Sequence, residues 1–220
     1  SKAIIKSHEA SHGMMIITDN QKSGRGRVNN QWFMGAGKGL AMSIIYMKPL
    51  SFENATLIPL ATGLAVAKAL ENRNFKPKLK WPNDIILNNK KVGGILCESE
   101  IESNNIKSLI IGIGLNINET INDFPKELQA KATSLSIETN YSFQRELICA
   151  IIATYLERTL KNFDSIIIEW LSFCGHLGKK VSFNYRGNKH TGIFKGINKK
   201  GHAQIDIDGK ILQFPSISLD

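Results

Sequence analysis

Three short segments of the sequence place cationic, amide or carboxylate side chains beside glycines, a pattern that suits the binding of a small anion. In the first segment, Gly24-Arg25-Gly26-Arg27 is followed by Trp32. Glycine makes such a loop flexible, and guanidinium groups can fold over a carboxylate or a phosphate. An exposed basic loop, or one that contacts RNA, explains this segment equally well.

The second segment is Lys80-Trp81-Pro82-Asn83-Asp84, in which a predicted strand ends in an aromatic residue and a proline fixes the turn. Asn83 and Asp84 present an amide and a carboxylate together, and such pairs orient substrates or hold a magnesium-bound phosphate. Most Asn-Asp pairs are ordinary turns, so this segment alone is a weak signal.

The third segment places Lys91 at the mouth of a predicted strand that begins Val92-Gly93-Gly94. The glycines leave the backbone bare, so a ligand could lie against the strand while Lys91 meets its carboxylate. A solvated hairpin lysine is the simpler explanation of Lys91 alone. Together, the three segments predict a pocket with cationic groups for a carboxylate and a phosphate.

Three other motifs are incomplete. Residues 8–12 spell H-E-x-x-H, but Gly13 and a predicted strand from Met14 would end the helix inside this zinc motif, and no third ligand follows at the expected spacing. Residues 35–39 lack the serine or threonine of a phosphate-binding loop, and residues 112–114 lack the third glycine of a dinucleotide fingerprint. None of them supports a zinc enzyme or a nucleotide-binding fold by itself.

Composition and charge narrow the class of protein. The chain has 220 residues, 42% hydrophobic and 21% charged, which excludes a mostly disordered chain and fits one large domain or a domain with a small appendage. Its net charge of +9 points first to nucleic acid. The excess is concentrated in residues 175–220, where eight lysines and arginines stand against three aspartates, a net charge of +5.

Cysteine and hydropathy patterns favour a cytosolic protein. Cys97, Cys149 and Cys174 are widely spaced and odd in number, which argues against a disulfide framework or a zinc ribbon and suits a reducing compartment. No apolar stretch approaches the roughly 18 residues that a membrane helix needs, and the first residues do not resemble a signal peptide. The chain is therefore expected to be soluble, cytoplasmic and independent of membranes.

Hydrophobic periodicity predicts an α+β domain with a mixed β-sheet at residues 1–174 and a small β-barrel at residues 175–220. Strict alternation of strands and helices is absent, which disfavours a doubly wound parallel sheet. Asn54 is expected to cap the first helix, with Pro59 near its first turn, and residues 88–90 are expected to form a hairpin turn. The expected strands are residues 14–18, 40–47, 78–81, 85–87, 92–101, 108–117, 181–185, 191–196, 202–207 and 210–214, and the expected helices are residues 54–72, 142–162 and 165–173.

The three segments occur in order, with Gly112-Ile113-Gly114-Leu115-Asn116 behind them, and this joint pattern closely resembles the biotin protein ligases (biotin–[acetyl-CoA-carboxylase] ligases). The resemblance covers nearly the whole chain and fits the short type that lacks a DNA-binding segment. It implies a class II synthetase-like biotin/lipoate ligase fold. It also implies a two-step reaction, in which biotin and MgATP give biotinyl-5′-AMP and a lysine of a biotin carboxyl carrier domain then accepts the biotin.

The same resemblance implies which residues line the substrate sites. The implied biotin contacts are Gln21, Gly24, Arg25, Gly26, Arg27, Trp32, Lys91, Gly93 and Gly94. The implied ATP contacts are Asn83, Asp84, Asn116 and Arg27. Catalytic roles fall to Lys91, Arg27 and Asp84, with Lys91 as a compact cation between carboxylate and α-phosphate. Mg²⁺ accompanies ATP, and no protein side chain is assigned to it as a ligand.

The arginine loop is expected to close over the intermediate, because an acyl adenylate hydrolyses in open water. The expected partner is the carrier domain of a biotin-dependent carboxylase, and no DNA partner is expected. The basic tail would attract an acidic carrier. A homodimer is neither required nor excluded.

Two departures from the family pattern stand out. Residues 28–31, Val-Asn-Asn-Gln, replace another Gly-Arg pair, so altered lid ordering or altered retention of the adenylate is expected. A Ser-Thr-Asn segment that usually helps to bind biotin should precede Met14 by some twenty to thirty residues and is not in this sequence. We therefore expect the absence of that segment to affect activity of the chain as given.

Three other functions are alternatives to a biotin protein ligase. A lipoate or octanoate ligase shares the fold and chemistry, but it would carry a different arginine-glycine motif and no Lys-Trp-Pro-Asn-Asp segment. An RNA-binding module would use aromatic residues of the basic tail, such as Phe183, Tyr185, Phe194 and Phe214, which could equally form the core of the barrel. A repressor is disfavoured because no DNA-binding segment is seen.

Overall fold

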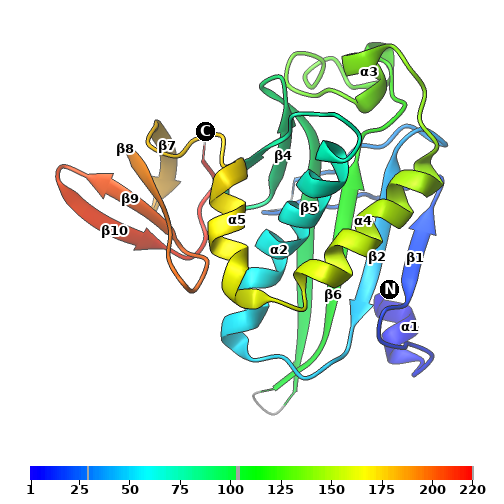
Figure 1. Cartoon of the computed structure of the whole chain (residues 1–220), viewed down its shortest axis with the longest axis horizontal. Coiled ribbons are helices and arrows are strands. Elements are labelled where there is room, and N and C mark those ends of the chain that lie inside the picture. Colours follow the sequence, from blue (N-terminus) through cyan, green and yellow to red (C-terminus); the bar gives the residue numbers. More distant parts are fainter. Residues whose placement is uncertain (29, 103–104, 220) are drawn as a thin grey trace.

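The computed structural model describes residues 1–28, 30–102 and 105–219, and its larger part is a six-stranded sheet with long helices against one face (Figure 1). The strand order is β1-β2-β6-β5-β4-β3, and all neighbouring strands are antiparallel. The strands are β1 (Met15–Thr18), β2 (Leu40–Tyr46), β3 (Lys78–Lys80), β4 (Asp84–Leu87), β5 (Lys90–Glu102) and β6 (Asn105–Leu115). All six expected strands of this domain are therefore present, with ends shifted by a few residues.

The helix α2 (Phe52–Glu71) forms the centre of the main hydrophobic core. It packs on the sheet and is itself covered by α4 (Arg145–Thr159) and α5 (Ile166–Phe173). Because it is enclosed on several sides, most of its residues are buried, and each fully buried aliphatic side chain contributes about 1.5–3 kcal/mol.

The expected start of α2 was wrong. The N-cap is Ser51, whose hydroxyl accepts a hydrogen bond from the backbone N–H of Asn54, so Asn54 supplies the donor and not the cap. The earlier start places Pro59 inside the helix rather than near its first turn.

The opposite face of the sheet has a floor of small residues. In the β-sheet register Gly94 on β5 lies beside Gly114 on β6, which lies beside Ala41 on β2, and Ser43 pairs with Gly112 in the same way. Towards one end of this face, the short helix α1 (Lys2–Lys6) packs Ile5 against residues of β2 and β6. Because these side chains are small, the part of this face beyond α1 is not filled by side chains of the sheet itself.

Residues 180–214 hold a second antiparallel sheet in the order β10-β9-β8-β7. Its strands are β7 (Lys180–Tyr185), β8 (Asn188–Ile197), β9 (Ala203–Ile207) and β10 (Lys210–Phe214). A single bridge between Phe183 and Leu219 brings the chain after β10 back to β7, so the sheet curls as a small barrel does. Phe183, Phe194 and Phe214 are buried in its core, which removes most of the stacking surface that RNA binding would need.

Local turn chemistry explains further elements. Asn88 and Asn89 both have positive φ, as a two-residue hairpin turn requires, which confirms a turn between β4 and β5, although Lys90 already belongs to β5 and pairs with Leu87. The helices α1 and α3 (Leu135–Thr139) were not expected, because each is only five residues long and too short for a helical period to appear. No helix in the described ranges is long and apolar enough to cross a membrane.

His176 packs at the junction of the two sheets and is only 8% exposed. Its ring lies 4.2 Å from the ring of Phe194 on β8 and 6.3 Å from that of Trp170 on α5. Burial, with smaller contributions from the charges of Lys80 and Lys179, lowers the pKa of His176 to about 4. The ring is therefore neutral in the folded protein at neutral pH.

This burial predicts a pH-dependent stability. The unfolded histidine protonates near its ordinary pKa of about 6.5 and the folded one only near 4, so the stabilisation is complete above about pH 6.5 and is lost as the pH falls toward 4. Urea unfolding at pH 7 and pH 5 should show a drop in unfolding free energy that is about 2 kcal/mol larger in the wild type than in His176→Phe. An equal drop in both proteins would contradict this assignment.

Candidate active site

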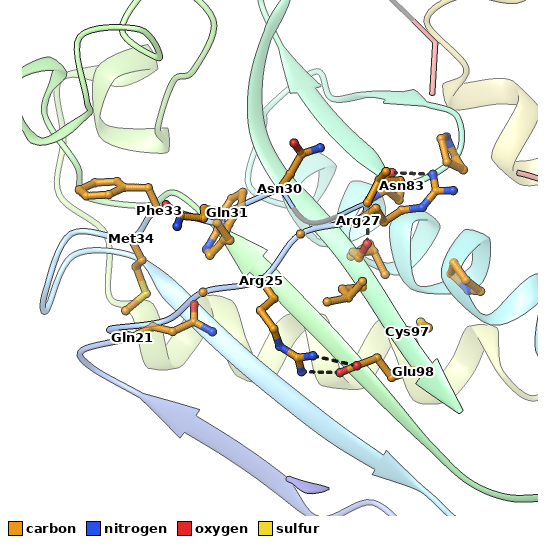
Figure 2. Close-up of a pocket in the computed structure, with 18 of the residues that line it drawn as sticks. Gln21, Arg25, Arg27, Asn30, Gln31, Phe33, Met34, Asn83, Cys97 and Glu98 are labelled. Atoms are coloured by element: carbon orange, nitrogen blue, oxygen red, sulfur yellow. Dashed lines mark hydrogen bonds and ion pairs between the residues drawn. The ribbon is translucent and has the colours of Figure 1, made fainter. Parts of the chain in front are cut away.

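The chain between β1 and β2 crosses the open face of the large sheet and divides the space above it into two clefts, of about 1220 Å³ and 630 Å³. Both clefts are lined by this loop and by β5. Figure 2 shows Arg25 and Arg27 of the loop pointing to different partners on either side of its backbone. The residues shared by both clefts include Gln21, Arg25, Arg27, Trp32, Asn83 and Glu98.

The floor of the smaller cleft requires glycine. A Cβ atom on Gly114 would lie 2.4 Å from Cε2 of Trp32, so the indole can lie on β6 only because position 114 has no side chain. Trp32 Nε1 and Gln21 Oε1 are buried with no hydrogen-bond partner among the described residues. A buried donor and a buried acceptor beside one cleft suit a ligand that both accepts and donates hydrogen bonds.

Lys91 and Asp84 form an ion pair at the floor of the same cleft, with Nζ 2.5 Å from Oδ1. The β4–β5 register places Asp84 beside Gly94, and Lys91 Nζ lies 3.5 Å from the position that a Cβ of Gly94 would take. The ammonium group of Lys91 therefore lies directly beside the backbone of Gly94, at a distance that a Cβ atom there would only just contact.

Arg27 is the partly buried cation of the loop. Its Nη2 donates to Ser216 Oγ at 2.8 Å and its Nη1 to Asn83 Oδ1 at 3.5 Å, while Asn83 Nδ2 donates to the carbonyl of Ile95. Burial lowers the pKa of Arg27, and the nearby charge of Asp84 opposes this shift. Both of its hydrogen-bond acceptors are neutral, so this guanidinium keeps a charge that an anion could neutralise.

Arg25 has a different environment. Its Nη1 and Nη2 donate to Oε1 and Oε2 of Glu98 at 3.0 and 2.6 Å, and Lys2 Nζ lies 2.7 Å from Oε1. Burial raises the pKa of Glu98, but the hydrogen bonds from Arg25 and Lys2 outweigh it and hold the pKa below its usual range.

The structure brings together most of the residues singled out in the sequence. Those that line one or both clefts are Gln21, Gly24, Arg25, Gly26, Arg27, Trp32, Asn83, Asp84, Lys91 and Gly94. Gly93 and Asn116 do not line either cleft. A Cβ on Gly93 would meet side chains of Leu115 and Ile85, because alternate residues of a strand face opposite sides.

Asn116 is buried beyond the end of β6, where its Nδ2 donates to the carbonyl of Thr133 at 2.9 Å. Its Oδ1 has no partner in the described part of the chain. Of the altered loop residues, Val28, Asn30 and Gln31 line the larger cleft, and Asn29 lies outside the described residues.

Two residues of the site were missed in the sequence. Glu98 stands among other polar residues near the end of a long strand, and Ser216 belongs to the tail of the second sheet. Neither carries a local motif. Within the described residues, no group of three or more histidine, cysteine, aspartate or glutamate side chains could hold a metal ion.

Lys91 on β5 and Arg27 in the loop place two cations around the smaller cleft, which lies between the loop and the glycine residues of the sheet. A site of this kind suits an enzyme that brings a carboxylate and a phosphate together away from water, which is the work of a carboxylate-activating ligase.

Comparison with known proteins agrees with this class. The model of the biotin/lipoate A/B protein ligase family matches residues 2–116, more than half of the chain. A bifunctional ligase/repressor BirA of Bacillus spizizenii is 32% identical over 222 residues, covering 98% of this chain and 68% of that protein. A biotin–[acetyl-CoA-carboxylase] ligase of Paracoccus denitrificans is 28% identical and covers 84% of this chain and 81% of its own length.

The fold agrees as well. The structure of the biotin protein ligase from Aquifex aeolicus in complex with biotin and ATP superimposes with a TM-score of 0.80 at 30% identity, covering 96% of this chain and 90% of that one. This chain belongs to the biotin/lipoate A/B protein ligase family.

Proposed function

We infer that this chain is a biotin protein ligase, which activates biotin with MgATP and transfers it to a lysine of a biotin carboxyl carrier domain. The observation that carries this inference is the cleft in which Lys91, paired with Asp84, stands over Gly94 beneath the arginine loop. The named functions of the similar ligases supply the substrates.

In the first step, a carboxylate oxygen of biotin attacks the α-phosphorus of ATP, the bond to the bridging oxygen of pyrophosphate breaks, and pyrophosphate leaves. Both reactants are anions, so their charges must be neutralised before they meet. Lys91 and Arg27 supply that neutralisation, and the contact with Asp84 orients the Lys91 ammonium group. Magnesium enters as part of the ATP substrate.

We assign one substrate to each of the two clefts. Biotin lies on the glycine floor of the smaller cleft, where the unpartnered Gln21 Oε1 and Trp32 Nε1 match the donors and the acceptor of its ureido group. ATP occupies the larger cleft beside Arg27 and Asn83. The assignments of Gly93 to biotin and Asn116 to ATP rest on the family resemblance alone.

In the second step, the amine of the acceptor lysine attacks the carbonyl of biotinyl-5′-AMP, and AMP leaves. The loop shields the mixed anhydride from water until the acceptor arrives. We assign substrate binding to residues 1–174, while residues 175–220 supply Ser216 and a basic surface for an acidic carrier. Three free cysteines fit a reducing cytosol. We assign no DNA-binding role to the described residues.

The deciding experiment is biotin-dependent exchange of label between pyrophosphate and ATP, followed by transfer of labelled biotin to a purified carrier domain. We expect both reactions with biotin, and no exchange with lipoate or octanoate in its place. Exchange that depends on lipoate or octanoate would instead identify the other branch of the family. No exchange from the full-length protein with any of the three acids would refute a ligase.

The glycine floor yields a separate prediction. Gly114→Ala should weaken biotin binding about tenfold or more, because the added methyl group displaces the indole of Trp32, with which it would clash. Titration calorimetry with biotin measures this effect. Gly63→Ala in α2 is the matched control, since its new methyl group makes only ordinary contacts, 3.6 Å from Leu79, and biotin affinity should not change. Equal affinity of Gly114→Ala and the wild type would contradict the placement of biotin.

A further inference from the structure

Arg25 and Arg27 are separated by a single residue of the loop, but one contacts a charged partner and the other contacts neutral partners. Arg25 makes a two-point contact with the carboxylate of Glu98, so both ends of its guanidinium group already have an anionic partner. Arg27 donates to the neutral oxygens of Ser216 and Asn83. Of the two, Arg25 is therefore hydrogen-bonded to a carboxylate, whereas the hydrogen bonds of Arg27 go to neutral groups that an anion could replace.

Figure 2 shows how this difference arises. The side chain of Arg25 extends along the floor to Glu98 on β5, whereas Arg27 turns to the opposite side of the loop, toward Asn83. The loop is thereby attached to the sheet at two points. Between these points lies Gly26, which lines both clefts and whose backbone N–H donates to the carbonyl of Asn30 at 2.7 Å.

Glu98 is well suited to hold Arg25. Its side chain is 25% exposed, it extends from the strand that forms the floor, and both of its oxygens are used by the guanidinium group. Lys2 of α1 contacts the same carboxylate, so one residue of β5 holds both the loop and the N-terminal helix. Bidentate pairs of this type are more directional than single ion pairs.

We propose that Glu98 is a positioning residue that holds Arg25 as the anchor of the loop, so that Arg25 shapes the biotin cleft without touching the anion itself. This rests on the proposed function and refines it: Arg27 and Lys91 meet the charges of the acyl adenylate, and Arg25 acts through Glu98. The family resemblance by itself would place both arginines on the ligand.

A first test needs no substrate. Hydrogen exchange of the unliganded full chain should be about fivefold faster at the amides of residues 24–27 in Glu98→Gln than in the wild type, the change expected from losing one such ion pair. The matched control is Glu100→Gln, two residues along the same strand, whose carboxylate accepts a hydrogen bond from Ser108 and does not contact the loop. Equal exchange in Glu98→Gln and wild type would overturn the anchor.

The second test separates indirect from direct action of Arg25. Glu98→Gln, Arg25→Gln and the double variant should each raise the KM for biotin by a similar factor of about five, with kcat nearly unchanged, because all three remove the same contact. Glu100→Gln should behave as the wild type. A much larger loss in Arg25→Gln than in Glu98→Gln would show that Arg25 meets the ligand directly, and it would overturn the proposal. A wild type without biotin-dependent exchange would instead refute the ligase, while the hydrogen-exchange result would still decide the anchor.

Discussion

Replacing Lys91 by alanine is expected to slow adenylation of biotin by about 100- to 1000-fold. Lys91 places its ammonium group beside the backbone of Gly94, where we propose that the carboxylate of biotin and the α-phosphate meet. Without this cation the two anions repel each other in a partly dehydrated cleft. Transfer of biotin from pre-formed adenylate to the carrier domain should slow much less, because the acceptor amine attacks as a neutral group.

Single-turnover measurements of the two steps check this prediction. Lys90→Ala is the matched control, because Lys90 is the adjacent residue but lines neither cleft. Lys91→Arg should keep part of the adenylation rate, since it retains the charge but not the compact geometry. If Lys91→Ala impaired transfer more than adenylation, Lys91 would belong to the second step.

Arg27→Gly is expected to release biotinyl-5′-AMP about 10- to 100-fold faster than the wild type. The variant removes the charge-assisted hydrogen bonds to Ser216 and Asn83, and the added glycine makes the loop more flexible. The adenylate would then leave the cleft before an acceptor lysine arrives.

Chromatography of free adenylate during turnover without carrier domain measures this loss. Ser216→Ala removes one of the same contacts from the opposite side, so it should release adenylate at an intermediate rate. Ser172→Ala on α5 serves as its control, because that hydroxyl donates only to the backbone of its own helix. Equal retention by Arg27→Gly and the wild type would contradict a role of Arg27 in holding the loop closed.

Much of the fold could be predicted because its signals are local. Alternating apolar residues identified the strands, and the Asn88-Asn89 turn followed from residues that tolerate positive φ. The start of α2 was misplaced because Ser51 and Asn54 both suit a cap, and only the packed helix shows which hydroxyl or amide accepts the bond. The five-residue helices were too short to leave a period in the sequence.

The grouping of the candidate site residues was predictable where several of them share a segment. The arginine loop, the Asn83-Asp84 turn and Lys91 are contiguous motifs, and the structure brings them to one pair of clefts. Gly93 was placed with Gly94 because the sequence does not show which of two adjacent glycines faces the core. Glu98 and Ser216 were missed because they lie 73 and 189 residues from their arginine partners.

The sequence by itself determined the kinds of chemical group available, the family resemblance and the positions of most strands, since these depend on side-chain type and on neighbours along the chain. The tertiary structure alone decided how the two loop arginines differ. Arg25 and Arg27 are the same residue type in the same motif, yet one meets a carboxylate and the other neutral oxygens. That difference depends on which distant strand or tail lies opposite each guanidinium group, and it is settled only when the two sheets and the loop pack together.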